Sequence, residues 1–457
     1  MGNYRPKYHF TVKEGWINDP NGFVFFKGKY HLFFQYHEKN HPGCMSWGHA
    51  VSDDLIHFEE LEPVIKHDSY YDKNGSWSGS SFVKDDVLYL MYTGHCETEN
   101  GNIQTQNIVI SEDGYTFRKY ERNPVISLKD LPSNCKICDF RDPSIFEHDG
   151  MYYVLIGNKS KEDVAQMLLY KSKDLLQWEF DRILISSNEL GYMLECPSSA
   201  KIGDKRVLIT SPQGLKDRGE DFWNIYSSIY TVGSLDFKEL NYLDVKEIDH
   251  GLDFYAPHII SNGNILISWM SIWERSLPLQ ELGNKWMNAF TMPRVLSLNE
   301  NKLIQRPLSH FSEHFVEEAN YEMNINEEVN LLKGQFKHLH LEFDKDNELS
   351  VKLFKKNDKY CEVKYIDNKV YIDRRNSLTP IISKLKEKSM DNYRYVSVNS
   401  NKVILDIYLD RFLVEVYINE GEEVMSFTCV HPSSYDDISF KGNNKLVKIV
   451  SKNFNDK

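Results

Sequence analysis

The sequence predicts an all-β protein, in which a five-bladed β-propeller is followed by a C-terminal β-sandwich. Short segments of alternating apolar residues, separated by turn residues, fill the chain from residue 22 onward. One arrangement of these segments recurs with a long period as far as residue 307, and a different arrangement follows it. Aromatic residues, which favour strands, are abundant, with 27 Tyr, 25 Phe and 8 Trp.

The recurring unit starts at residues 19, 78, 142, 195 and 256, so that successive units are about sixty residues apart. The first unit contains a hairpin at 23–36 and two further strands at 47–52 and 55–58. About four short strands per unit indicate propeller blades rather than the coils of a solenoid. Because the innermost strands of a propeller line a central channel, the residues that open each unit are predicted to meet at one end of it.

The pattern changes after residue 307. Residues 1–308 are predicted as the propeller, 309–320 as a linker or short helix, and 321–457 as the sandwich, where strands continue without the sixty-residue spacing. A chain of 457 residues is too long for one small core, so two domains fit its length.

Composition and charge exclude several classes of function. The net charge of −13 repels nucleic acid and anionic membranes, so neither is predicted as a partner. An anionic substrate would need a local basic site. Residues 1–10 contain no apolar core of signal-peptide length, and no stretch is long and apolar enough to cross a membrane, so a cytoplasmic protein is predicted. Nothing in the sequence predicts an oligomeric state.

The cysteines are odd in number and scattered, which in a cytoplasmic protein predicts reduced thiols. Cys135 and Cys138 have the spacing of half a zinc knuckle, but no second pair of ligands follows. The 16 histidines have no metal-ligand spacing either. Neither a metal nor a cofactor is therefore predicted. The cysteines are Cys44, Cys96, Cys135, Cys138, Cys196, Cys361 and Cys429.

Three of the stretches that open a unit carry an acid: Trp16–Gly22 contains Asp19, Phe140–Pro143 contains Asp142, and Glu195 begins Glu-Cys-Pro. For Asp19 alone, a turn residue is the simpler interpretation, because Asp is common in turns. Packing does not select several carboxylates at one channel mouth, since they repel one another. Glycoside hydrolysis does require two: one attacks or activates water, and the other protonates the leaving oxygen.

The neighbouring residues suggest a role for each acid. Met193 and Leu194 give Glu195 an apolar setting, which favours a protonated carboxyl, so Glu195 is predicted as the proton donor. Arg141 would keep Asp142 ionised if the two pair. Asp19 lies between the amides of Asn18 and Asn21, which could hold it as an anion, and is predicted as the nucleophile.

The three motifs, in this order, resemble the signature motifs of the invertase family, glycoside hydrolase family 32. The resemblance covers essentially the whole chain. It implies a five-bladed propeller with a C-terminal sandwich, in agreement with the spacing of the units. Further similar stretches are Phe33–Tyr36, Ser46–His49, Trp77–Ser80, Ile209–Gly214, Asp253–Pro257 and Val414–Asn419.

The resemblance also implies a mechanism that retains the configuration of a terminal β-fructofuranosyl unit. Asp19 would be the nucleophile and Glu195 the general acid/base, with carboxyls about 5–5.5 Å apart. Asp142 would stabilise the transition state through fructose hydroxyls. No metal is required. The substrate-binding residues implied are Asn18, Gln35, Trp47, Trp77, Ser78, Arg141, Tyr255 and, more loosely, Trp269, although Trp47 and Trp269 fit core positions equally well and Gln35 equally fits a strand edge.

The predicted activity is hydrolysis of sucrose or sucrose 6-phosphate. Alternatives are an exo-hydrolase of short fructans, a fructosyltransferase, and a non-catalytic carbohydrate-binding propeller, against which the three acids argue. An inverting furanosidase of the arabinan-cleaving type would place its carboxyls about 6.5–9.5 Å apart. The chain has Trp77, Ser144 and Ser198 where the family often has Phe, Lys and Asp, which leaves the leaving-group preference open.

Overall fold

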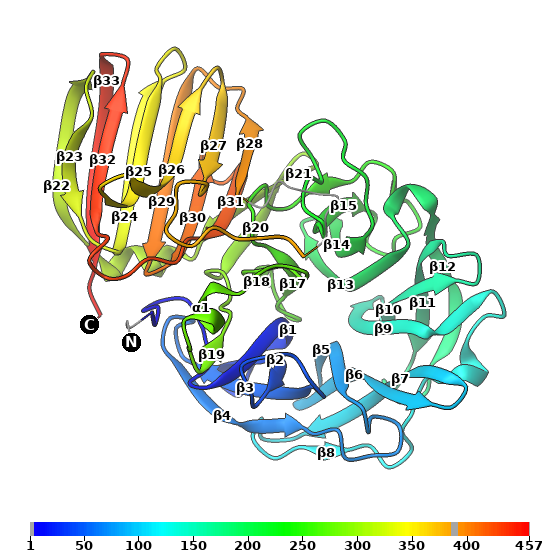
Figure 1. Cartoon of the computed structure of the whole chain (residues 1–457). Helices are drawn as coiled ribbons and strands as arrows, with labels where there is room; N and C mark the ends of the chain where they lie inside the picture. Colours follow the sequence, from blue (N-terminus) through cyan, green and yellow to red (C-terminus); the bar gives the residue numbers. More distant parts are fainter. Residues whose placement is uncertain (1–3, 385–391, 457) are drawn as a thin grey trace.

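The computed structural model describes residues 4–384 and 392–456 (Figure 1). Over these residues the strands form five propeller sheets and two sandwich sheets, which confirms the predicted fold class. In Figure 1 the propeller sheets are arranged around a common axis and the sandwich stands to one side. No helix in these ranges is long and apolar enough to cross a membrane.

Blade 1 is completed by a strand from the far end of the propeller. β19 (Trp286–Met287) pairs in parallel with β1 (Gly15–Phe26), with Gly15 opposite Trp286. The ring is therefore closed by joining its first strand to residues translated some 270 positions later. The other strands of blade 1 are β2 (Lys29–His37), β3 (Ser46–Ser52) and β4 (Phe58–Ile65).

Blades 2 to 5 each contain four strands, and within each blade these strands lie side by side in the order of the sequence. Short helices connect some of them, at Leu128–Asp130, Asn188–Leu190 and α1 (Pro278–Glu281). Blade 2 contains β5 (Ser76–Lys84), β6 (Val87–Thr98), β7 (Gly101–Ser111) and β8 (Arg118–Lys119); blade 3, β9 (Cys135–His148), β10 (Met151–Ser160), β11 (Ala165–Ser172) and β12 (Glu179–Ser187). Blade 4 contains β13 (Met193–Ile202), β14 (Lys205–Gln213), β15 (Ile229–Gly233) and β16 (Lys246–Glu247); blade 5, β17 (Tyr255–Ile259), β18 (Ile265–Trp269), β20 (Arg294–Asn299) and β21 (Lys302–Pro307).

A repeated Ser-x-Asp turn explains part of the sequence periodicity. In blade 1 the Ser52 hydroxyl accepts a hydrogen bond from the Leu55 N–H, and Asp54 accepts two from the N–H groups of residues 56 and 57. The same bonds recur around Ser172 and Asp174 in blade 3. These side chains accept hydrogen bonds from backbone N–H groups that no longer have a partner in a neighbouring strand once the third strand ends.

The sandwich begins earlier than predicted. A 3-10 helix at Ser309–His314 leads directly into β22 (Phe315–Ile325), whose Phe315 pairs with Phe454 of the last strand. Residues 315–320 are therefore strand and not linker. The start of this strand could not be predicted from the sequence, because residues 316–318 are all exposed and apolar alternation is missing there.

The two sandwich sheets enclose one apolar core. Their orders are β22-β33-β24-β29-β30-β31 and β23-β32-β25-β26-β27-β28. The remaining bounds are β23 (Val329–Lys333), β24 (Phe336–Asp344), β25 (Leu349–Lys356), β26 (Lys359–Ile366), β27 (Lys369–Asp373), β28 (Tyr393–Ser397), β29 (Lys402–Asp410), β30 (Leu413–Ile418), β31 (Glu423–Thr428), β32 (Asp437–Gly442) and β33 (Lys445–Phe454).

Buried ion pairs join the two domains. Arg294 of blade 5 is fully buried and bonds Glu415 of β30 at 2.6 Å and Asp249 at 2.9 Å. From the sandwich side, Arg374 pairs with Asp253, and Arg394 pairs with Glu247 of β16. Each partner would be an uncompensated buried charge without the other, so these pairs fix how the domains dock.

The N-terminal segment is also held by the sandwich. The carboxylate of Asp410 accepts hydrogen bonds from the backbone N–H groups of Lys7, Tyr8 and His9, at 2.7 to 2.9 Å. The His9 ring lies between Asp410 and Glu415, which raise its pKa to about 9 against the opposing effect of burial. His9 is therefore a buried cation that ties the start of the chain to the second domain.

The prediction of reduced thiols is wrong for one pair of cysteines. The structure joins Cys361 of β26 to Cys429 by a disulfide. The pairing links residues 68 positions apart, which only the folded sandwich brings together. Cys44, Cys96, Cys135, Cys138 and Cys196 are free.

Candidate active site

The three acids predicted from the sequence line one cavity of about 300 Å³. Asp19 comes from β1, Asp142 from β9 and Glu195 from β13, so three different blades contribute. The cavity thus lies where the innermost strands converge, as the repeat predicts. Its remaining lining residues are Asn18, Gln35, Pro42, Gly43, Met45, Trp77, Ser78, Arg141 and Trp273.

A β-bulge at the start of each blade aims these side chains. The register between the first two strands of a blade shifts between Ile17 and Pro20, and again between Glu195 and Ser198. Asp142 and Cys196 have φ of 65° and 46°, values that residues other than glycine rarely adopt. Bulges with left-handed residues redirect side chains next to active sites, so the recurring sequence junctions are recurring bulges.

Asp19 is held by two neighbouring donors. The Ser78 hydroxyl donates to Oδ2 at 2.6 Å and the Asn18 amide to Oδ1 at 3.1 Å, while Trp16 Nε1 donates to the Asn18 oxygen and fixes that amide. Burial raises the pKa of Asp19, and the bonds from Ser78 and Asn18 oppose the rise. Asn21, the other amide predicted to hold Asp19, instead accepts a hydrogen bond from the Gly79 N–H.

Asp142 is the acid whose proton affinity changes most clearly. Burial raises its pKa to about 7, and the neighbouring Glu195 and Asp19 add to the rise. The charge of Arg141 lowers the pKa, as does the N–H of Cys196, which donates to Oδ2 at 2.9 Å. The condition for the prediction that Arg141 keeps Asp142 ionised is not met, because the guanidinium pairs with Glu195 and not with Asp142.

Arg141 bonds Glu195 of the next blade. Its Nη2 and Nε donate to Oε1 of Glu195 at 2.9 and 3.1 Å, and the hydroxyl of Tyr255 lies 2.5 Å from Oε2. The predicted apolar setting of Glu195 is therefore wrong. Leu194 points to the opposite face of β13, because successive side chains of a strand alternate, and the carboxylate of Glu195 meets polar groups of Arg141 and Tyr255.

The predicted binding residues divide into two groups. Gln35, Trp77 and Ser78 line the cavity together with Asn18 and Arg141. Trp77 stacks on His95 with ring centroids 4.0 Å apart. Trp47 does not line the cavity: it is fully buried, and its Nε1 donates to the Trp77 carbonyl at 2.9 Å. Tyr255 reaches the site only through Glu195.

Trp269 is also absent from the cavity wall, and Trp273 takes the place predicted for it. Trp269 is fully buried, and its ring packs edge-on against Trp273 at 4.8 Å. Trp273 stacks on Trp16 at 6.0 Å and faces the cavity. The sequence Ser268–Trp273 contains both tryptophans, and only the turn after β18 decides which is exposed.

Two of the three departures from the family pattern lie away from the cavity wall. Ser198 accepts a hydrogen bond from the Ile259 N–H at 3.1 Å, which joins blades 4 and 5, and Ser144 is buried on β9. Neither lines the cavity. Of the three, Trp77 alone is placed to contact a substrate.

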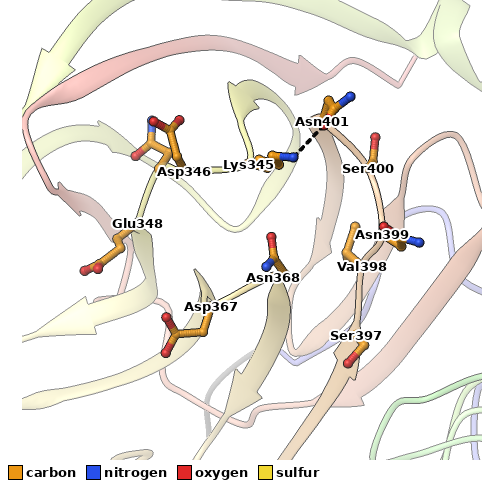
Figure 2. A pocket seen from close by; sticks show the side chains of 11 residues that line it. Lys345, Asp346, Glu348, Asp367, Asn368, Ser397, Val398, Asn399, Ser400 and Asn401 are labelled. Atoms are coloured by element: carbon orange, nitrogen blue, oxygen red, sulfur yellow. Dashed lines mark hydrogen bonds between the residues drawn. The ribbon is translucent and has the colours of Figure 1, made fainter.

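A second cavity, of about 680 Å³, lies at one end of the sandwich (Figure 2). The loops β24–β25, β26–β27 and β28–β29 surround it, and Lys345 donates to Asn401 at 2.7 Å across it. Among its described lining residues there is no aromatic ring on which a sugar could stack. It therefore lacks the aromatic wall that Trp77 and Trp273 give the propeller cavity.

Folding also brings together two groups of potential metal ligands that sequence spacing did not indicate. One contains Cys361, Cys429 and His431, two of which form the disulfide. The other contains Asp221, Glu247 and His250, where Glu247 already pairs with Arg394. Both lie outside the cavity of the three acids.

Comparison with known proteins agrees with this geometry. Residues 9–307 match the glycosyl hydrolases family 32 N-terminal domain, and residues 300–455 match the C-terminal domain of the same family. A sucrose-6-phosphate hydrolase of Bacillus subtilis is 32% identical, with 93% of this chain and 88% of that protein aligned. A raffinose invertase of Escherichia coli is also 32% identical, over 92% and 88% of the two chains.

Solved structures show the same fold. The sucrose-6-phosphate hydrolase of Lactobacillus gasseri superposes with a TM-score of 0.88 at 28% identity, covering 99% of this chain and 93% of that one. A β-fructofuranosidase of Bombyx mori superposes with a TM-score of 0.85 at 30% identity, covering 99% and 94%. The chain therefore belongs to glycoside hydrolase family 32 and is a glycoside hydrolase.

Proposed function

We propose that the protein is a retaining β-fructofuranosidase that releases fructose from sucrose or sucrose 6-phosphate by double displacement. The observation that carries this proposal is the convergence of Asp19, Asp142 and Glu195 in one cavity, each with different hydrogen-bond partners. The sucrose-6-phosphate hydrolases and β-fructofuranosidase among its relatives support the substrate class.

In the first step, a carboxylate oxygen of Asp19 attacks the anomeric carbon of the fructosyl unit. The glycosidic bond breaks as Glu195 gives its proton to the departing oxygen. The donors Ser78 and Asn18 favour the ionised form of Asp19, which a nucleophile requires. The product of this step is fructose bonded to Asp19, and the leaving sugar is free.

In the second step, Glu195 takes a proton from water, and the water oxygen attacks the anomeric carbon and releases Asp19. The Tyr255 hydroxyl and the Arg141 guanidinium stabilise the carboxylate form of Glu195, which is the form that acts as base. If a sugar hydroxyl replaced water here, the enzyme would transfer fructose instead of hydrolysing it.

Asp142 acts on the sugar rather than on the bond that breaks. In its ionised form it accepts hydrogen bonds from fructose hydroxyls and offsets the positive charge that develops on the ring. Its backbone partner Cys196 and its burial fix the carboxylate before substrate arrives. The same arrangement would serve the exo-hydrolysis of short fructans, which differ from sucrose only beyond the fructosyl unit.

The proposal is tested by fructose release from sucrose and sucrose 6-phosphate. Asp19→Ala and Glu195→Gln are expected to lower kcat by at least about a thousandfold, and activity near that of the unmodified enzyme would refute the roles. Methanol as acceptor should yield methyl β-fructofuranoside, and the α anomer would refute retention. Comparing kcat/KM for a fructan trisaccharide with that for sucrose decides between invertase and exo-hydrolase.

A further inference from the structure

We propose that Lys159 and Tyr192 form the subsite for the leaving sugar, and that the Lys159 ammonium binds a phosphate monoester on that sugar. This inference rests on the proposed function, because it assigns the outer part of the same site. It concerns residues that do not line the cavity of the three acids. It would make the enzyme prefer sucrose 6-phosphate to sucrose.

The position of Glu195 locates the leaving sugar. Because Glu195 protonates the oxygen of the breaking bond, the departing group lies on its side of the cavity. From Glu195 a row of contacts runs outward: Arg141 Nη1 bonds Asp139 at 3.2 Å, and Asp139 bonds Lys159 Nζ at 3.2 Å. The side chains of Glu195 and Arg141 are 14% and 11% exposed, while those of Asp139 and Lys159 are 20% and 19% exposed.

Tyr192 completes this row at the surface. The Lys159 ammonium lies 5.3 Å from the centre of the Tyr192 ring, and Tyr192 is 41% exposed. Burial and then the charge of Glu195 raise the pKa of Tyr192, in keeping with its position close to the acid. An exposed aromatic ring beside a charged group suits a sugar that carries an anionic substituent.

A β-bulge between β9 and β10 places Lys159 at this position. Asn158 of β10 pairs with Phe140 of β9, but the next pair joins Ser160 to Cys135, so the four residues 136–139 of β9 stand opposite the single residue Lys159. The Asn158 side chain closes the bulge by donating to the carbonyls of Lys136 and Asp139 at 2.9 and 2.7 Å. Lys159 and Asp139 thereby come to face each other at the end of the blade.

Two glycines allow blades 3 and 4 to approach closely enough for Lys159 and Tyr192 to meet. A Cβ on Gly157 of β10 would lie 2.0 Å from the Leu194 carbonyl of β13, so only glycine permits this approach. Gly214 likewise lies under the Tyr192 ring, where a Cβ would meet it at 2.6 Å. Blade 3 and blade 4 therefore present Lys159 and Tyr192 side by side.

Charge supports an anionic ligand here. Lys136, Arg141 and Lys159 carry three positive charges here, and the paired acids Asp139 and Asp163 carry two negative charges. When Glu195 carries the proton that it donates, the group therefore has a net charge of +1. The whole chain carries −13, so a local positive site is what an anionic substrate requires. Asp163 lies 3.8 Å from Lys159 Nζ, beyond hydrogen-bond distance, which leaves ammonium donors for phosphate oxygens.

The test measures kcat/KM for sucrose 6-phosphate and for sucrose in the unmodified enzyme, in Lys159→Gln and in Lys136→Gln. Lys136 lies in the same bulge and pairs with Asp163, so its substitution is a matched control. The unmodified enzyme should prefer sucrose 6-phosphate. Lys159→Gln should lower that preference by about tenfold or more, the effect of one charge-assisted hydrogen bond, and Lys136→Gln should leave it within about twofold.

Product inhibition gives a second readout that does not depend on turnover of the phosphorylated substrate. Glucose 6-phosphate should inhibit sucrose hydrolysis more strongly than glucose does, and Lys159→Gln should abolish the difference. An unchanged preference in Lys159→Gln, or an equal loss with both substrates, would overturn the inference and leave the proposed function intact. Absence of fructose release from either substrate by the unmodified enzyme would instead refute the proposed function.

Discussion

Replacing Tyr255 with Phe removes one hydroxyl from beside the acid and leaves the ring in place. This hydroxyl lies 2.5 Å from Oε2 of Glu195 and 3.2 Å from the Ser211 carbonyl, so its single proton serves the nearer acceptor. In the proposed mechanism Glu195 gives up its proton in the first step, and this bond would stabilise the carboxylate that forms. A hydrogen bond to a charged group contributes about 1.5–3 kcal/mol, so Tyr255→Phe should lower kcat/KM for sucrose by about 10- to 150-fold.

The assay compares two leaving groups. β-Fructofuranosyl fluoride needs little help from an acid, since fluoride departs as an anion, so Tyr255→Phe should lower its turnover by less than about threefold. Tyr226→Phe is the matched control, because its ring packs on Tyr255 at 5.6 Å and it belongs neither to the acids nor to the cavity wall. Equal losses with sucrose and with the fluoride would refute the reasoning, because the hydroxyl would then support the structure and not proton transfer.

Three further outcomes are expected. The pKa of Asp142 is raised to about 7, so the folded state keeps a proton that the unfolded state loses near pH 4, and stability should fall as pH rises between these values. Asp142→Asn should flatten this decline of Tm with pH. Parallel plots of Tm against pH for the variant and the unmodified protein would contradict the prediction. Arg294→Met removes the buried cation that pairs with both Asp249 and Glu415, although Glu415 keeps its bond to His9. It should lower the free energy of unfolding by about 3–5 kcal/mol in urea denaturation, with Arg306→Met at an exposed pair as the near-neutral control. Thiol titration of the denatured, unreduced chain should find five groups, Cys361 and Cys429 becoming reactive only after reduction; seven before reduction would refute the disulfide.

The blades could be predicted because each unit repeats the same local chemistry. A bulge at the junction and a Ser-x-Asp turn at the outer edge both need particular residue types, so they leave a periodic trace in the sequence. β22 leaves no such trace, because most of its side chains are exposed. Its place in the sandwich depends on pairing with β33 at the other end of the domain.

In the site, residues could be predicted and their partners could not. The motifs predicted that Asp19, Asp142 and Glu195 converge, yet neighbours in sequence were poor guides to their surroundings. Arg141 adjoins Asp142 but reaches Glu195, and Asn21 turns to Gly79. Trp273 takes the position predicted for Trp269 for a similar reason, since the turn after β18 decides which ring faces the cavity. Such contacts are made across blades and are set by the packing of the whole ring.

The pairing of β1 with β19 has a consequence for biosynthesis. The strand that carries Asp19 is among the first to leave the ribosome, but its parallel neighbour at Trp286–Met287 is made much later. Its flanking segment at residues 7–9 is bound by Asp410, which is later still. The segment around Asp19 therefore gains all these partners only after residue 410 has been made, although Asp19 itself is made before Asp142 and Glu195.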